Sequence, residues 1–268
     1  MIFGDLKVLR REANDAKGNT RWACECVCGK LMVTRGTRLS YGSTRSCGCS
    51  RRSYDLDTAY FHKTSIRNSY WAGFIVADGC LTRNGALKIA LSARDRGHLE
   101  KLKSDLSFSG PIRDSLTTTP GGREATYSCL AVWSKDLLLD LKHNFNLTER
   151  KTLTLLPPYR LPEPLVEAFI VGLLDGDGCI HTVDYSHRIL RLDVAGTLSV
   201  VSWVKERFQM WCGADVRLPR IREHDGGTLY SLRLQGRNAV RVAVRLLAVD
   251  VPKLERKWNI AQKMVMDK

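Results

Sequence analysis

The chain has 268 residues and carries 42 Lys or Arg against 28 Asp or Glu, a net charge of +14. Its 44% hydrophobic and 26% charged content is ordinary for a globular protein and excludes wholesale disorder. Apolar stretches such as 71–77 are too short to span a bilayer, and residues 1–7 lack the basic start and apolar run of a signal peptide. We therefore expect a cytoplasmic protein that contacts no membrane and binds a polyanion.

Cysteines are concentrated in the first fifth of the chain. Five of the nine lie there, three before an 18-residue spacer and two after it. Gly29 and Gly48 give both groups the backbone freedom for tight turns. Two close thiolate pairs suit the tetrahedral coordination of one structural zinc ion, which would also help a small segment to fold. The expected ligands are Cys26, Cys28, Cys47 and Cys49, with Cys24 as the alternative. Residues 1–55 hold 11 Lys or Arg and 5 Asp or Glu, so we expect a DNA-contacting finger.

An internal repeat follows this segment. Residues 69–81 and 168–180 share one pattern at a constant offset of 99, which matches Gly73 with Gly172, Ala77 with Gly176 and Asp78 with Asp177. A second similarity, 147–151 with 254–257, ends at a lysine in each copy, Lys151 and Lys257. We place the two copies at 56–160 and 161–268.

The predicted elements have the same order in both copies. In the first, the patterns predict a helix ending at Asp78, a hairpin around 83–85, a strand over 87–91, a helix over 95–106, strands over 111–116 and 125–133, and helices over 135–145 and 149–155. In the second, they predict strands over 180–183, 189–194, 216–222 and 229–234, and helices over 199–211, 238–247 and 253–266. A proline-rich stretch, 156–164, links the copies.

The two motif segments carry the chemistry. Small residues four apart let two helix backbones approach closely, so packing the motif helices together would bring Asp78 and Asp177 to one place. The helix ends there would add carbonyls that have no partner within the helix. Such oxygen ligands suit Mg²⁺, and paired metal ions can activate water and stabilise the leaving oxygen in phosphodiester cleavage. Acids that merely end a helix are the alternative, but two matched copies favour the metal site.

These segments resemble the paired motifs of LAGLIDADG homing endonucleases in their single-chain form, over residues 57–268. The resemblance implies an α/β (α+β) fold of two pseudo-symmetric αββαββα repeats, with a β-saddle that binds double-stranded DNA as a monomer. It implies double-strand cleavage at a long asymmetric target with two or more Mg²⁺ ions, held by Asp78, Asp177 and the carbonyls of Ala77 and Gly176. It also places a basic residue near the hydrolytic water, for which Lys151 and Lys257 match, although both could be ordinary surface lysines. The cysteine-rich segment resembles zinc-ribbon-like modules found beside nuclease domains.

Basic residues on or beside the predicted strands are the expected DNA contacts, because alternate side chains of a ribbon face the groove. They are Arg83, Lys88, Arg113 and Arg123 in the first copy and Arg188, Arg191, Arg217, Arg220, Arg222 and Arg233 in the second. A solvated outer face is the alternative. Cys80 and Cys179 are expected to be buried behind the motifs. The competing function is a non-cleaving nucleic-acid binder on the same scaffold, an intron maturase or a transcription regulator.

Overall fold

The computed structural model describes residues 1–48, 54–82, 85–118, 122, 124–148, 151–183, 189–217, 219–224 and 227–266. The chain forms two compact units, Met1–Tyr54 and Asp55–Lys268. None of the helices in the described ranges combines the length and the apolar character needed to cross a membrane.

The first unit is a small antiparallel sheet with one short helix. Its strands β1 (Ile2–Phe3), β2 (Leu6–Glu12), β3 (Arg21–Cys26) and β4 (Leu31–Arg35) lie in chain order, and α1 (Gly36–Ser40) follows. The fully buried core consists of Leu6, Cys24, Cys26 and Leu39. So small a core is typical of domains that need a covalent or metal link for stability.

The second unit contains the two copies, and each has the element order αββαββα. The first copy consists of α2 (Ile66–Asp78), β5 (Gly79–Leu81), β6 (Ala86–Ser92), α3 (Arg96–Asp105), β7 (Arg113–Thr118), β8 (Glu124–Trp133) and α4 (Lys135–Phe145). The second consists of α5 (Glu163–Asp175), β9 (Cys179–Val183), β10 (Ile189–Gly196), α6 (Leu198–Cys212), β11 (Arg220–His224), β12 (Gly227–Gln235) and α7 (Arg237–Leu247). Their sheets have equivalent orders, β5-β6-β8-β7 and β9-β10-β12-β11. The predicted fold class is confirmed.

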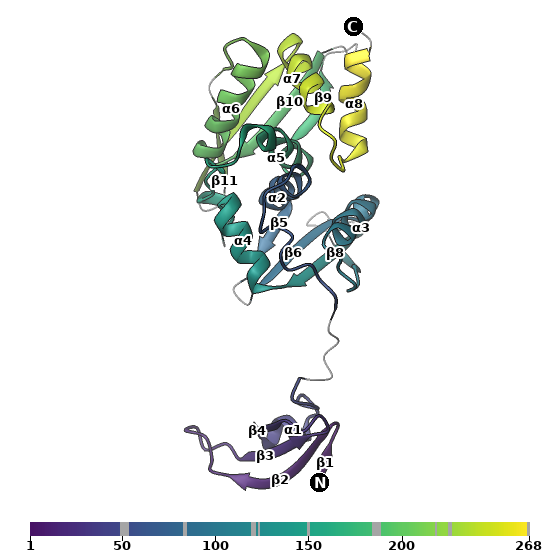
Figure 1. Ribbon diagram of the computed structural model, residues 1–268, viewed down its shortest axis with the longest axis vertical. Helices are drawn as coiled ribbons and strands as arrows, with labels where there is room; N and C mark the ends of the chain where they lie inside the picture. Colours follow the sequence, from purple (N-terminus) through teal and green to yellow (C-terminus); the bar gives the residue numbers. More distant parts are fainter. Residues whose placement is uncertain are drawn as a thin grey trace. The chain divides into compact units, whose positions relative to one another are not determined.

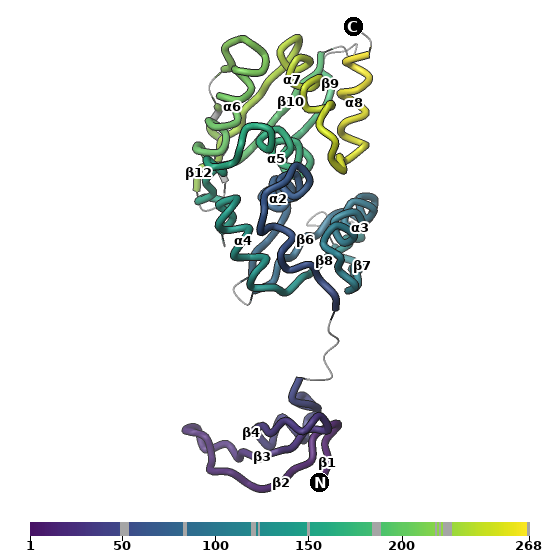
Figure 2. Tube along the Cα trace, viewed as in Figure 1, coloured from purple at the N-terminus to yellow at the C-terminus, as the bar shows by residue number. Residues whose placement is uncertain are grey.

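Helices α2 and α5 pack against each other at the centre of this unit, between the two sheets (Figure 1). The Cα trace shows the first copy, in blue and teal, and the second, in green and yellow, meeting at this pair (Figure 2). A Cβ atom added to Gly73 would lie 2.0 Å from the carbonyl oxygen of Phe169, and one added to Gly172 would lie 2.0 Å from that of Tyr70. The two backbones are therefore in direct contact, as the spacing of small residues predicts.

Local sequence fixes where these helices begin. Ser65 caps α2: its hydroxyl accepts from the Asn68 N–H while the Asn68 side chain accepts from the Ser65 N–H. Pro164 lies in the first turn of α5, where the missing N–H costs no helical hydrogen bond. Every residue from Asn68 to Val76 is buried, because α2 is covered on several sides.

Some predicted boundaries are wrong. The helix expected over 149–155 is, in its described part, the short 3₁₀ turn η2 (Lys151–Leu153), because Pro157 forces the chain before it into an extended conformation. The strand expected from 216 begins at Arg220, and the last helix, α8, covers Glu255–Met266. Of the hairpin expected around 83–85, residues 83 and 84 lie outside the described residues.

Replacing Gly73 by alanine tests the helix contact. The new methyl group would collide with backbone that cannot move independently, so we expect the free energy of unfolding to fall by about 1–3 kcal/mol. Gly97→Ala in α3 is the control, because its Cβ would meet nothing within 4 Å and should stabilise by about 0.5–1 kcal/mol. Chemical denaturation measures both, and equal effects of the two substitutions would contradict the packing.

Candidate active site

The C-terminal ends of α2 and α5 bring the two motif aspartates together. Asp78 is the last residue of α2, and Asp177 lies two residues beyond the end of α5. The ends are in contact: a Cβ added to Gly176 would lie 2.2 Å from the Cβ of Ala77 and 3.4 Å from Oδ2 of Asp78. The structure therefore gathers the four residues expected to bind Mg²⁺, Asp78, Asp177, Ala77 and Gly176.

Both carboxyl groups reach solvent, but the protein crowds around them. Loss of hydration, with a further contribution from the charge of Asp177, raises the pKa of Asp78 to about 6, against the opposing charges of Lys257 and Lys151. Loss of hydration likewise raises the pKa of Asp177, and the same two lysines oppose it. A cation bound between the two carboxylates would reduce the repulsion between their negative charges. An all-oxygen set of carboxylates and carbonyls fits a hard divalent ion such as Mg²⁺.

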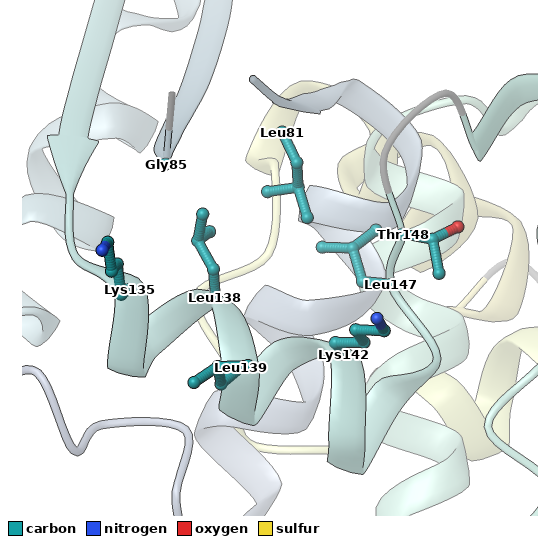
Figure 3. Close-up of a pocket in the computed structure, with 8 residues that line it drawn as sticks. All are labelled: Leu81, Gly85, Lys135, Leu138, Leu139, Lys142, Leu147 and Thr148. Carbon is teal, nitrogen blue, oxygen red and sulfur yellow. The ribbon is translucent and has the colours of Figure 1, made fainter. Parts of the chain in front are cut away.

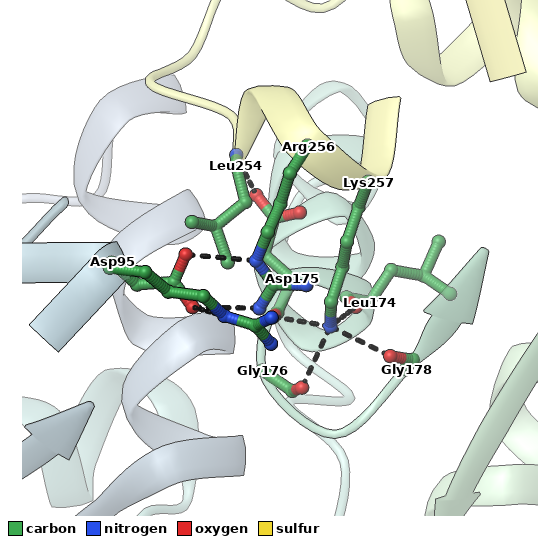
Figure 4. Close-up of polar contacts among 9 residues, drawn as sticks. Asp95, Leu174, Asp175, Gly176, Gly178, Leu254, Arg256 and Lys257 are labelled. Carbon is green, nitrogen blue, oxygen red and sulfur yellow. Dashed lines mark hydrogen bonds and ion pairs between the residues drawn. The ribbon is translucent and has the colours of Figure 1, made fainter. Parts of the chain in front are cut away.

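A lysine from the end of each copy lies against its own motif helix. Lys151 donates hydrogen bonds from Nζ to the carbonyls of Val76 and Ala77, the latter at 2.7 Å. Lys257 donates to the carbonyls of Leu174, Asp175, Gly176 and Gly178 at 2.9, 2.6, 2.9 and 2.7 Å (Figure 4). Both lysines bind helix-end carbonyls left without partners in the helix. The carbonyls of Ala77 and Gly176 each keep a second lone pair for a metal ion.

A cleft of about 450 Å³ opens beside these groups. Ala77, Lys151 and Asp177 line it, together with Ala195 and Gly196 from the C-terminal end of β10. An ammonium group, a carboxylate and a backbone carbonyl thus meet in one solvent-accessible space. Such a combination can hold a hard cation and stabilise negative charge on a bound anion.

Another hollow, of about 570 Å³, lies beside α4 and differs in chemistry (Figure 3). Its described lining combines the ammonium groups of Lys135 and Lys142 with aliphatic side chains such as Leu138 and Leu139, and includes no carboxylate. It therefore lacks the donor set for a hard cation, and the cleft at the motif helices remains the candidate site.

Comparison with known proteins bears on the fold. No family model and no curated protein matches the sequence. Among solved structures, the chain is similar to the homing endonuclease I-WcaI bound to its DNA recognition sequence, with a TM-score of 0.50, 13% identity and coverage of 74% of this chain and 90% of that one. It is also similar to the I-LtrWI LAGLIDADG homing endonuclease bound to target DNA, with a TM-score of 0.46, 10% identity and coverage of 78% and 91%. The chain has the LAGLIDADG fold.

The outward faces of the two LAGLIDADG sheets carry some of the expected DNA contacts. Lys88 on β6 and Arg113 on β7 are exposed, and so is Arg217 before β11. Arg220 and Arg222 pair with Ser231 and Leu229 of β12, but their side chains are not described. Arg83, Arg123 and Arg188 lie outside the described residues.

The second LAGLIDADG sheet holds an acidic residue that sequence reasoning missed. Asp193 accepts from Arg191 Nε at 2.8 Å and from Arg233 Nε at 3.2 Å, so it links two of the expected DNA-binding residues. Arg191 and Asp193 lie two apart on β10, and register pairs Asp193 with Arg233. The sequence could have indicated this contact, because Arg191 and Asp193 lie two residues apart on an expected strand and so have their side chains on one face.

The expected burial of Cys80 and Cys179 is wrong. Both thiols are exposed, because Gly79 and Ile180 occupy the inward positions of β5 and β9 and strand alternation turns their neighbours outward. Cys80 pairs with Lys88, and Cys179 lies 3.2 Å from Nδ1 of His181. These thiols therefore belong to the same face as the basic residues.

In the first unit, three of the expected zinc ligands lie together. The ligand atoms of Cys26, Cys28 and Cys47 all lie within 4.8 Å of one another, with 3.3 Å between the sulfurs of Cys28 and Cys47. Cys24 is not part of this group; its thiol lies 3.8 Å from the Trp22 carbonyl, and burial raises its pKa. Cys49 lies outside the described residues. The cluster is compatible with zinc.

Proposed function

We propose that this chain is a site-specific DNA endonuclease of the homing type, which makes divalent-metal-dependent double-strand breaks at a long asymmetric target. The observation that carries the proposal is the meeting of Asp78 and Asp177 at the ends of two helices in backbone contact. The similar structure of I-WcaI supports DNA as the partner, since that protein is described as bound to its DNA recognition sequence.

The chain's own residues supply a binding site and a charge distribution for this reaction. Asp78 and Asp177 would hold Mg²⁺ with the carbonyls of Ala77 and Gly176, and the bound ions would supply activated water and stabilise the leaving oxygen. The ammonium group of Lys151 lines the cleft beside Asp177, where a substrate phosphate would approach. Its positive charge opposes the negative charge that develops on the phosphate in the transition state.

The sheets would bind the DNA. A pair of antiparallel strands fits the major groove, and the exposed Lys88 and Arg113 of the first copy lie on such strands. In the second copy, Asp193 holds Arg191 and Arg233 in fixed orientations, which suits bidentate recognition of a base edge. The remaining arginines named from the sequence stay predictions.

A non-cleaving DNA binder on the same scaffold is the competing proposal. It would use the sheets in the same way. It would gain nothing from two crowded carboxylates, whose negative charges repel phosphate in the absence of a metal ion. The aspartate pair therefore favours cleavage.

Cleavage is tested directly by incubating the purified protein with Mg²⁺ and DNA from around its own coding locus, or with a library of randomised targets. We expect double-strand breaks at one site. Asp78→Asn and Asp177→Asn should abolish them while DNA binding persists, because only the metal ligands are lost. Asp136→Asn, an exposed acid in the first turn of α4, is the matched control and should cut normally. Cleavage that is undiminished in Asp78→Asn would refute the mechanism, and binding without cleavage in the wild type would favour the competing proposal.

We also propose that Cys26, Cys28 and Cys47, with Cys49 as the fourth ligand, hold one structural zinc ion, and that the finger extends the DNA footprint. Metal analysis of the native protein should find one zinc ion per chain. Cys28→Ser should lose the zinc, whereas Cys129→Ser, a free thiol in the LAGLIDADG unit, should retain it. A native protein without zinc, or full occupancy in Cys28→Ser, would contradict this proposal.

A further inference from the structure

The two lysines at the motif-helix ends differ in the number of backbone carbonyls that surround their ammonium groups. An ammonium group has three N–H donors, and four carbonyl oxygens at 2.6 to 2.9 Å surround Nζ of Lys257. The side chain is buried, with 9% of the residue exposed. Every donor of Lys257 is therefore committed to the backbone at the end of α5 (Figure 4).

Lys151 has a different environment. Its Nζ donates to two carbonyls, those of Val76 and Ala77, so the third N–H is not taken up by these contacts. The residue is only partly buried, and it lines the 450 Å³ cleft together with Asp177. Its ammonium group can therefore reach a substrate in that cleft.

Residues at the start of α8, and Leu254 directly before it, hold Lys257 in its place. The Leu254 N–H and the Trp258 indole N–H donate to the two oxygens of Asp175, at 2.9 and 2.7 Å. Arg256 forms a bidentate ion pair with Asp95 of the first copy, with both contacts at 2.8 Å (Figure 4). The backbone on both sides of Lys257 is thus anchored. Lys151 instead lies in the short turn η2.

This difference originates in the sequence of the motifs. Asp175 is buried at the position where the first copy has Val76, and the Tyr70 hydroxyl of the first copy donates to it at 2.8 Å. The side chain of Val76 has no atom that accepts hydrogen bonds, so the first copy cannot form the equivalent anchor around Lys151.

We propose that Lys257 is a structural cap of α5, that Lys151 alone of the two lysines assists hydrolysis, and that the two DNA strands are consequently cut at unequal rates. The catalytic part rests on the proposed function. In the reaction, the water oxygen bonds to phosphorus, the bond from phosphorus to the leaving sugar oxygen breaks, and the water proton passes to that oxygen through solvent. The N–H of Lys151 that does not contact the carbonyls of Val76 and Ala77 stabilises the added negative charge on the phosphate.

Chemical labelling tests the two environments without any cleavage. The full chain, in its native state and without DNA, is treated with formaldehyde and cyanoborohydride, and methylation of each lysine is followed by mass spectrometry. Lys151 should be modified faster than Lys257. Asp175→Asn should speed the modification of Lys257 and leave that of Lys151 unchanged, because it loosens only the α8 anchor. Equal rates in the wild type, or faster modification of Lys257, would overturn the assignment.

Thermal unfolding gives a second, independent measurement. Lys257→Met should lower Tm by more than Lys151→Met, because it removes the cap from four carbonyls rather than from two. An equal or larger loss in Lys151→Met would contradict the structural role of Lys257.

Strand-specific nicking tests the catalytic part. On a supercoiled plasmid with the target, the wild type should accumulate a circle nicked always in the same strand. Lys151→Met should slow that strand roughly 100-fold and remove the preference. Lys257→Met, assayed below its Tm, should keep the wild-type strand preference. Equal and opposite effects of the two substitutions would show that the lysines are equivalent and would overturn the inference. If the wild type binds DNA but cuts neither strand, the proposed function fails, and labelling and Tm alone decide the structural role of Lys257.

Discussion

The direct backbone contact between α2 and α5 is the constraint on which the rest of the second unit depends. A Cβ at Gly73 or Gly172 would occupy the space of a carbonyl oxygen in the other helix. Because the helices touch at this point, their C-terminal ends also meet, and Asp78 and Asp177 share one site. The same helix pair lies between the two sheets, one from each copy. The packing of two helices therefore determines the positions of both the aspartates and the sheets on either side of them.

The distribution of charge in the chain is consistent with a metal site that acts on a polyanion. Crowding raises the pKa of both aspartates, so their negative charge is costly in the absence of a cation. The whole chain has an excess of 14 positive charges, and within the second unit Lys88 and Arg113 occupy exposed strand positions. A positive surface attracts a polyanion, and an acidic centre needs metal ions before it can accept phosphate. Together these features are the physical basis of the proposed nuclease activity.

Much of this could be predicted from the sequence, because the repeat at a constant offset of 99 identified the motif helices, the aspartate pair and the order of elements. What could not be predicted depends on tertiary contacts. The different environments of Lys151 and Lys257 were not predicted, because the four carbonyls around Lys257 come together only when α8 docks through Asp175 and Asp95. The outward position of Cys80 followed from strand alternation, but only once the register of β5 was known.

Divalent-ion binding by the metal-free protein tests the central claim most directly. Titration with Mn²⁺, followed by electron paramagnetic resonance, reports ions bound to the protein separately from free ions. The wild type should bind Mn²⁺ more tightly than either Asp78→Asn or Asp177→Asn, and the double variant should lose this binding altogether. A double variant that binds Mn²⁺ as tightly as the wild type would show that the two aspartates do not form a metal site.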